Sequence, residues 1–233
     1  MEEKNELLEL DLQDNSILEH RLYLVMADSF YTRHGKRIMD LALVIPLLFL
    51  LVPFMALVYI IASLVSGQPV FYASTRLGRN SEVIRVWKFR TMVQDADRAL
   101  QEWKHTNPDL DREYRSAFKV KNDPRVTRLG RILRNTSIDE LPQLWNVLIG
   151  QMSLVGPRPY FTHELAPFPE IQNLIAAVTP GLTGPWQVQG RNTVPPDIRM
   201  EFDVQYVLNV SLLKDLEYLA RTIKVMLSFD GTR

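Results

Sequence analysis

Two neighbouring carboxylates, Asp139 and Glu140, stand in the stretch NTSIDELPQLWN beside a strongly basic segment. The residues just before them include one acid, Asp123, and the cations Lys119, Lys121, Arg125, Arg128, Arg131 and Arg134. Carboxylates are ligands that Mg²⁺ prefers, usually together with substrate phosphates. An aspartate can also attack phosphorus and form an aspartyl-phosphate. The pattern therefore suits a site for a phosphate and a metal ion.

A purely structural explanation of these residues is also open. Ser137 and Glu140 have the spacing of a capping box, and acids in the first turn of a helix are favoured by its dipole. Asp139 could itself be the cap, because Pro142 is best accommodated in a first turn. The arginines could face solvent or lipid headgroups. Among them, Arg134 lies close enough to the acid pair to hold a phosphate oxygen bidentately.

Three other segments carry groups that could bind an anion or a sugar. Lys88 and Arg90 alternate with aromatic residues in WKFRTM, which places both cations on one face of a strand. Prolines restrict the backbone on both sides of Arg158 in GPRPY. The loop TPGLTGPWQVQGRN offers Gln187, Gln189, Arg191 and Asn192 to a base, ribose or sugar. An ordinary rigid turn or loop is the alternative for the last two segments.

Composition excludes several other chemistries. The 233 residues have a formal net charge of zero, which gives no argument for binding nucleic acid. The chain has no cysteine, so disulfides, thiolate metal sites and cysteine nucleophiles are excluded. It contains no GxxxxGK[ST], GxGxxG or GxSxG motif, so P-loop, Rossmann and serine hydrolase functions lose their usual support.

The segment from Leu41 to Val65 carries no charge and is longer than the ~18 apolar residues that indicate a membrane helix. A helix buried on all sides in a soluble core is the alternative. Pro46 and Pro53 lie inside the segment, where proline kinks a helix. Cations flank it on both sides and mark the cytoplasmic face of a membrane. A helix that enters, bends near Pro53 and returns satisfies both flanks, so a re-entrant helix is predicted.

The rest of the pattern predicts an α/β fold that is mainly helical. Alternation around Val83–Phe89 indicates a short β-hairpin with its turn at 78–81. Apolar residues recur at helical spacing in 126–133, 144–148 and 212–226, which predicts amphipathic helices. Residues 1–35 form an acidic N-terminal arm, and residues 167–196, rich in proline and glycine, are expected to be mostly loops.

Four stretches together resemble the bacterial sugar transferases, the monotopic polyprenyl-phosphate phosphoglycosyl transferases. They are KRIMDLALVIPLLFLLVP, WKFRTM, RILRNTSIDELPQLWNVLIGQMSLVGPRP and PGLTGPWQVQGRN. The resemblance runs from about Lys36 to the C-terminus. It implies a re-entrant membrane helix hairpin over residues 36–66 and a small cytoplasmic catalytic domain over 67–233, surrounded by membrane-surface amphipathic helices. The implied location is the bacterial inner membrane.

The resemblance also implies a reaction: a sugar-1-phosphate, here a hexose-1-phosphate, passes from a UDP-sugar to undecaprenyl phosphate by a ping-pong mechanism. Asp139 attacks the β-phosphorus and releases UMP, while Mg²⁺ shields the phosphates with Glu140 beside it as ligand or proton acceptor. Lys88, Arg134 and Arg158 match basic residues of the family's site. The wider substrate-binding set that we predict adds Arg90, Gln187 and Arg191. Such a transfer is the first membrane step of O-antigen, capsule or exopolysaccharide synthesis.

The sequence departs from the family pattern at the helix break, where many members have Ser-Pro and this chain has Val52-Pro53. Two other functions stay open: a non-catalytic membrane scaffold of a polysaccharide assembly complex, and a single-span protein with a soluble binding domain. The expected partners are a UDP-sugar, undecaprenyl phosphate and membrane lipid, with no nucleic acid. The sugar, the pathway, the role of residues 1–35 and a homodimer are left open.

Overall fold

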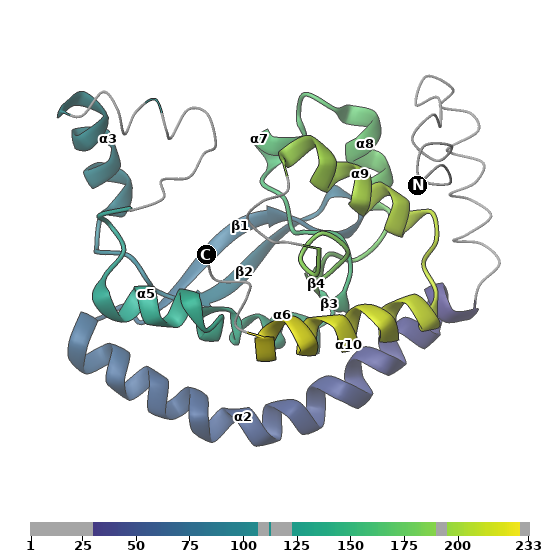
Figure 1. Cartoon of the computed structure of the whole chain (residues 1–233), viewed down its shortest axis with the longest axis horizontal. Helices are drawn as coiled ribbons and strands as arrows, with labels where there is room; N and C mark the ends of the chain where they lie inside the picture. The colour runs from purple at the N-terminus through teal and green to yellow at the C-terminus, as the bar shows by residue number, and fades with distance from the viewer. Residues whose placement is uncertain (1–29, 107–111, 113–122, 190–194, 229–233) are drawn as a thin grey trace.

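A long bent helix, α2 (Lys36–Ser66), runs along one side of the molecule, and most other elements stand on its concave side (Figure 1). In this computed structural model the described residues are 30–106, 112, 123–189 and 195–228. Most of the predicted acidic arm lies outside them. Tyr31–Gly35 form a π-helical stretch, η1, that leads directly into α2.

Helix α2 is bent as a whole (Figure 1) and continues past both of its prolines, so the predicted break at Pro53 does not interrupt the helix. A proline removes one hydrogen bond and kinks the axis, while the neighbouring bonds can hold the helix together. Both halves of α2 pack on the rest of the chain: Val44 joins the main core, and Val58 and Ala62 join a second cluster near the hairpin. This shape is compatible with re-entry into a membrane, which stays a prediction.

The apolar surface of α2 is largely exposed. Its most apolar stretch has a mean hydropathy of 2.9, and 11% of that stretch is buried, whereas a helix in a soluble core would be mostly buried. Phe49 in the middle of the helix is 88% exposed. By length and composition the helix could cross a membrane.

The predicted hairpin is present. Strands β1 (Phe71–Leu77) and β2 (Val83–Phe89) pair antiparallel around a turn that contains η2 (Arg79–Ser81). Tyr72 lies opposite Lys88, and Arg76 lies opposite Ile84. Since alternate residues of a strand share a face, Arg76 and Lys88 stand on the same face of the hairpin.

Three consecutive elements carry the acid pair: α5 (Arg128–Asn135), η3 (Ile138–Glu140) and α6 (Gln143–Leu148). Helix α5 is capped by Thr127, whose side chain accepts the N–H of Gly130 at 2.9 Å. It passes so close to the chain after β2 that a Cβ on Gly130 would lie 2.0 Å from the carbonyl oxygen of Thr91. Only glycine allows this approach.

Helix α6 is fixed to the edge of β2 by Asn146, which is fully buried. Its Nδ2 donates to the carbonyl of Arg85 at 2.7 Å, and its Oδ1 accepts the N–H of Trp87 at 3.1 Å. The amide thus satisfies backbone groups that a neighbouring strand would otherwise bind. This contact sets the position of β2, and with it Lys88, relative to the acid pair.

A second sheet joins β3 (Ser153–Val155) to β4 (Gly181–Thr183) in parallel, which the sequence did not predict. The expectation of loops over 167–196 was wrong in part, because α8 (Pro169–Ala176) lies there with its proline at the first helical position. The remaining helices are α3 (Ala96–Thr106), α7 (Thr162–Leu165), α9 (Pro196–Val207) and α10 (Leu212–Ser228).

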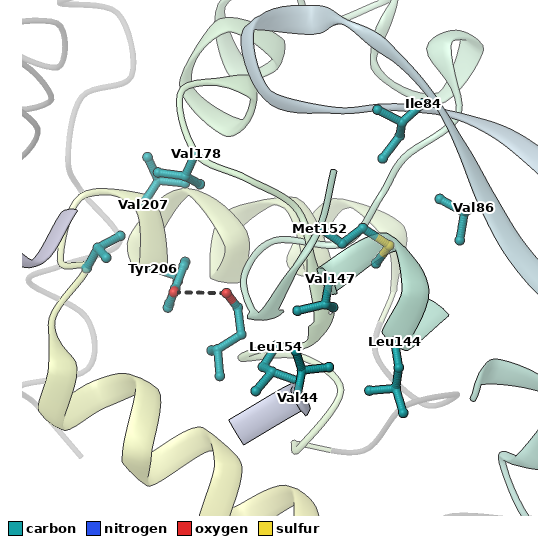
Figure 2. Packing of buried hydrophobic residues seen from close by; sticks show 12 residues of the cluster. Val44, Ile84, Val86, Leu144, Val147, Met152, Leu154, Val178, Tyr206 and Val207 are labelled. Atoms are coloured by element: carbon teal, nitrogen blue, oxygen red, sulfur yellow. Dashed lines mark hydrogen bonds between the residues drawn. The ribbon is translucent and has the colours of Figure 1, made fainter. Parts of the chain in front are cut away.

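The main core gathers side chains from α2, β2, α6, β3 and α9 (Figure 2). Tyr206 of α9 contributes both its ring and its hydroxyl, which donates to the carbonyl of Val155 at 3.4 Å and to Asp215 Oδ1 at 2.6 Å. Asp215 is fully buried and also accepts hydrogen bonds from Lys36 and Tyr31. The charged start of α2 is therefore held by groups of the protein.

Candidate active site

The acid pair lies in η3, a single turn of 3-10 helix between α5 and α6. Asp139 is 8% exposed, whereas the Glu140 side chain is 40% exposed. The predicted capping box is not formed, because the Ser137 side chain does not cap this turn. Ser137 has φ 56°, a left-handed conformation that is uncommon for serine. Backbone strain of this kind often occurs at functional sites.

Two of the predicted cations flank the pair. Lys88 Nζ lies 2.7 Å from Glu140 Oε1. Arg134, in the last turn of α5, donates its Nε to Thr91 Oγ1 at 2.9 Å, which fixes its guanidinium. Burial, and then repulsion from Glu140, raises the pKa of Asp139 to about 6, while Lys88 and Arg134 act in the opposite direction. A buried carboxylate with two cations beside it is suited to attack a phosphate whose charge those cations balance.

The same two acids fit a shared Mg²⁺ ion. Among the described residues, no group of three or more acids or histidines could hold a metal by itself. Mg²⁺ usually takes one or two carboxylates and completes its shell with water and substrate phosphates. A cation between Asp139 and Glu140 would also relieve the repulsion that raises the pKa of Asp139. The donor set therefore fits an ion that arrives with a phosphate substrate.

Arg158 belongs to a second cationic group, formed with Arg76 and Arg199. Its backbone N–H donates to Asp203 Oδ2 at 3.1 Å, and the Tyr160 hydroxyl donates to the same oxygen at 2.8 Å. Arg76 Nη1 donates to the carbonyl of Pro159 at 3.3 Å. The loop that the prolines were expected to restrict is thus also held by hydrogen bonds from β1 and α9.

The guanidinium groups of Arg158 and Arg199 both approach Trp186. The two Cζ atoms lie 5.6 Å and 4.9 Å from the centre of its ring. Burial, followed by the charge of Arg158, lowers the pKa of Arg199, and the same causes lower the pKa of Arg76 to about 10. Glu140 counteracts the shift at Arg76, so within the second group Arg76 is in electrostatic range of the acid pair.

The described contacts of Arg90 lie at the end of α2, and its predicted part in substrate binding stays a prediction. Its Nη2 donates to the carbonyls of Ser66 and Gly67 at 2.5 Å and 2.9 Å, and its Nη1 donates to that of Gln68 at 3.4 Å. Arg90 thus closes the C-terminal end of α2, where helix carbonyls lack partners. Of the two predicted cations in WKFRTM, Lys88 is the one that contacts the acid pair.

The loop after β4 is described in part. Gln187 follows Trp186, the residue that Arg158 and Arg199 of the second group approach. Its buried Oε1 has no hydrogen-bond partner among the described residues. Gln189 is described, whereas Arg191 and Asn192 lie outside the described residues. The predicted set therefore separates into an acid-pair group with Lys88 and Arg134, and a second group with Arg158 and Gln187.

Sequence reasoning missed Arg76, Thr91, Arg199 and Asp203. Alternation along β1 places Arg76 on one strand face with Ser74, and pairing that strand with the WKFRTM strand could have indicated it. Arg199 and Asp203 are four residues apart on α9, a spacing too common in helices to single them out. No local sequence pattern indicates that Thr91 would bind Arg134.

Known proteins resemble this chain over most of its length. The model of a family described as bacterial sugar transferase matches residues 31–229. A UDP-galactose-lipid carrier transferase from Erwinia amylovora is 40% identical over 92% of this chain and 46% of its own length. The exopolysaccharide production protein ExoY from Sinorhizobium fredii is 43% identical over 81% of this chain and 84% of its own.

An undecaprenyl-phosphate galactose phosphotransferase from Salmonella typhimurium is 42% identical over 86% of this chain and 42% of its own length. The chain thus spans less than half of the Erwinia and Salmonella proteins but most of ExoY.

Proposed function

Because the chain belongs to the bacterial sugar transferase family, we propose that it transfers a hexose-1-phosphate from a UDP-sugar to undecaprenyl phosphate. The names of two relatives specify a lipid carrier or undecaprenyl phosphate together with galactose, which supports this class of donor and acceptor. The ExoY relatives support a role in exopolysaccharide synthesis. The observation that carries the proposal is the buried Asp139 carboxylate beside Glu140, Lys88 and Arg134.

In the first step, a carboxylate oxygen of Asp139 attacks the β-phosphorus of the UDP-sugar. A P–O bond forms to Asp139, the bond to the bridging oxygen breaks, and UMP leaves with that electron pair. In the second step, a phosphate oxygen of undecaprenyl phosphate attacks the same phosphorus and releases the Asp139 carboxylate. Arg134, fixed by Thr91, is suited to bind a non-bridging phosphate oxygen in both steps.

Mg²⁺ is the proposed cofactor, held by Asp139 and Glu140 together with substrate oxygens. When bound, it would neutralise phosphate charge as the P–O bonds exchange. Lys88 binds one carboxylate oxygen of Glu140 through their 2.7 Å contact, which leaves the other oxygen for the metal ion. Glu140 is thereby a ligand or proton acceptor and not the nucleophile.

We place this reaction at the bacterial inner membrane, with the catalytic domain facing the cytoplasm. The lipid acceptor requires a membrane, and α2 supplies an exposed apolar segment. Helices α5, α6 and α10 lie along the side of the molecule that α2 occupies (Figure 1). All three expose apolar residues that suit a membrane surface, as does the residue that caps α6: Ile132, Trp145, Ile149, Leu213, Ile223 and Met226. A non-catalytic scaffold is less well supported, because such a protein has no need for this cationic setting around two acids.

The deciding experiment uses detergent-solubilised protein and a panel of UDP-sugars, with UMP release as the signal. With donor alone, the native chain should release about one UMP per site and gain the mass of one hexose phosphate, since the covalent intermediate waits for its acceptor. Asp139→Asn keeps the size of the side chain but removes the attacking anion, so both signals should vanish. Glu140→Gln should lower the rate of UMP release and of hexose-phosphate addition.

The location of the added mass identifies the nucleophile. A hexose phosphate on Glu140, or UMP release that begins only after undecaprenyl phosphate is added, would replace this mechanism with another nucleophile or with direct transfer.

A further inference from the structure

We propose that Arg158 and Arg199 form an anion-binding subsite beside Trp186 that holds the phosphate of the nucleoside monophosphate leaving group. Arg199 then becomes a substrate-binding residue outside the acid-pair group. This inference rests on the proposed function and deepens it, because it assigns the two products of the first step to different cationic groups.

The first observation is the placement of two like charges at one aromatic ring. Arg158 comes from the loop after β3 and Arg199 from α9, yet both guanidinium groups lie within 5.6 Å of the centre of the Trp186 ring. Glu164 offsets part of both charges, and its Oε1 lies 4.0 Å from Arg158 Nη2. Two neighbouring cations destabilise each other, and an anion bound between them reverses that effect. Planar guanidinium groups match phosphate oxygens in pairs.

The second observation is the rigidity of the loop that presents Arg158. Residues 156–160 are held by hydrogen bonds to β1, β4 and α9. They join the Gly156 N–H to Thr183, the Gly181 N–H to Pro157, the Arg158 N–H to Asp203 and the Leu77 N–H to Tyr160. The Arg158 side chain itself is 30% exposed. A fixed backbone with an accessible guanidinium is preorganised to bind a ligand.

The third observation is a buried donor without a partner. Trp186 is 6% exposed, and its indole N–H has no acceptor among the described residues. Buried polar groups are rarely left in this state, and an oxygen of a bound ligand would satisfy the indole. Gln187 Oε1, in the next residue, is also buried and without a partner there. A nucleotide offers both acceptor and donor atoms.

The position of the subsite suits a leaving group. Arg76 lies on the hairpin face that carries Lys88, and its Nη1 donates to the carbonyl of Pro159, the residue after Arg158, at 3.3 Å. The subsite is therefore adjacent to the acid pair but does not coincide with it. A leaving group needs this arrangement, because it is bonded to the attacked phosphorus at the start and must be held apart from it afterwards.

The test measures binding of UMP and of uridine to the full-length, detergent-solubilised chain by titration calorimetry. Arg199→Gln should lower the affinity for UMP on the order of tenfold or more, as expected for the loss of a charge-assisted hydrogen bond. The affinity for uridine should stay almost unchanged. Trp186→Phe keeps an aromatic six-membered ring but removes the indole N–H, and it should also weaken UMP binding. Arg221→Gln is the matched control, because Arg221 pairs with Glu217 on the surface of α10. This variant should bind UMP as the native chain does.

Several results would overturn the inference. Equal UMP affinity in the native, Arg199→Gln and Arg221→Gln chains would do so, as would equal weakening of uridine and UMP. A higher KM for undecaprenyl phosphate in Arg199→Gln with unchanged UMP affinity would assign the subsite to the acceptor. The proposed function fails separately, if the native chain releases no UMP from any UDP-sugar. Unchanged thermal melting of the ligand-free variants excludes a folding defect.

Discussion

Lys88 Nζ and Glu140 Oε1 lie 2.7 Å apart, which joins strand β2 to the turn that carries the acid pair. Both side chains are partly exposed, so this ion pair contributes at most ~1 kcal/mol to stability. Its effect on the neighbouring Asp139 is electrostatic, because the charge of Lys88 lowers the pKa of that carboxyl. On the proposed mechanism, the contact is therefore expected to affect the rate more than the stability.

Replacing Lys88 by Gln should test this distinction. The pKa of Asp139 should rise further, so less of the nucleophile is ionised in mild acid, and UMP release should fall more at pH 6 than at pH 8. Thermal melting should change little. The control is Arg98→Gln, which breaks the exposed Arg98–Glu102 pair on α3. An equal loss of rate at both pH values would show that Lys88 does not act through Asp139.

Arg134→Lys should be far from conservative. The fork of arginine can bond Thr91 Oγ1 and a phosphate together, whereas a lysine ammonium cannot reproduce that geometry. We expect kcat/KM to fall by about tenfold or more, the size of a lost charge-assisted hydrogen bond. Arg128→Lys at the exposed start of α5 should stay within about twofold of the native value. Similar small effects at both positions would remove Arg134 from the phosphate site.

The bend of α2 predicts that both of its ends lie on one side of the membrane. Single cysteines at Ser16 and Ser116 can be labelled selectively, because the chain has no cysteine of its own. Both should be protected from an impermeant reagent in intact cells and labelled after lysis. Labelling of the Ser16 variant alone in intact cells would indicate a helix that crosses the membrane.

Asp203 should make stability depend on pH. Burial raises its pKa to about 7, against the hydrogen bonds from Arg158 and Tyr160, so the folded state holds a proton that the unfolded chain loses near pH 4. Its contribution to stability is present below that pH, declines up to about pH 7 and stays low above it. Asp203→Asn keeps an acceptor for both donors but does not titrate.

The measurement is thermal melting of the native chain and the Asp203→Asn variant at pH 5 and pH 8. The native chain should lose stability relative to the variant as the pH rises, and the comparison removes titrations that the two chains share. A difference that is the same at both pH values would mean that Asp203 is ionised throughout.

Much of the acid-pair site could be predicted from the sequence. The amphipathic spacing of α5 and the alternation of β2 are local patterns, and they placed Arg134 and Lys88 on the correct elements. Lys88 and Arg90 show where such patterns stop. The two residues are two positions apart and were expected on one strand face. The strand ends before Arg90, and the Arg90 side chain binds the carbonyls at the end of α2.

The sequence by itself determined the elements that depend on neighbours in the chain: an apolar helix, a hairpin, amphipathic helices, and two acids beside cations. The tertiary structure alone decided the contacts between distant residues. Asp203 meets the Arg158 backbone across 45 positions, and Asn146 meets β2 across about 60. Periodicity and charge report only local preferences, whereas these hydrogen bonds form because packing buries polar groups that must then find partners.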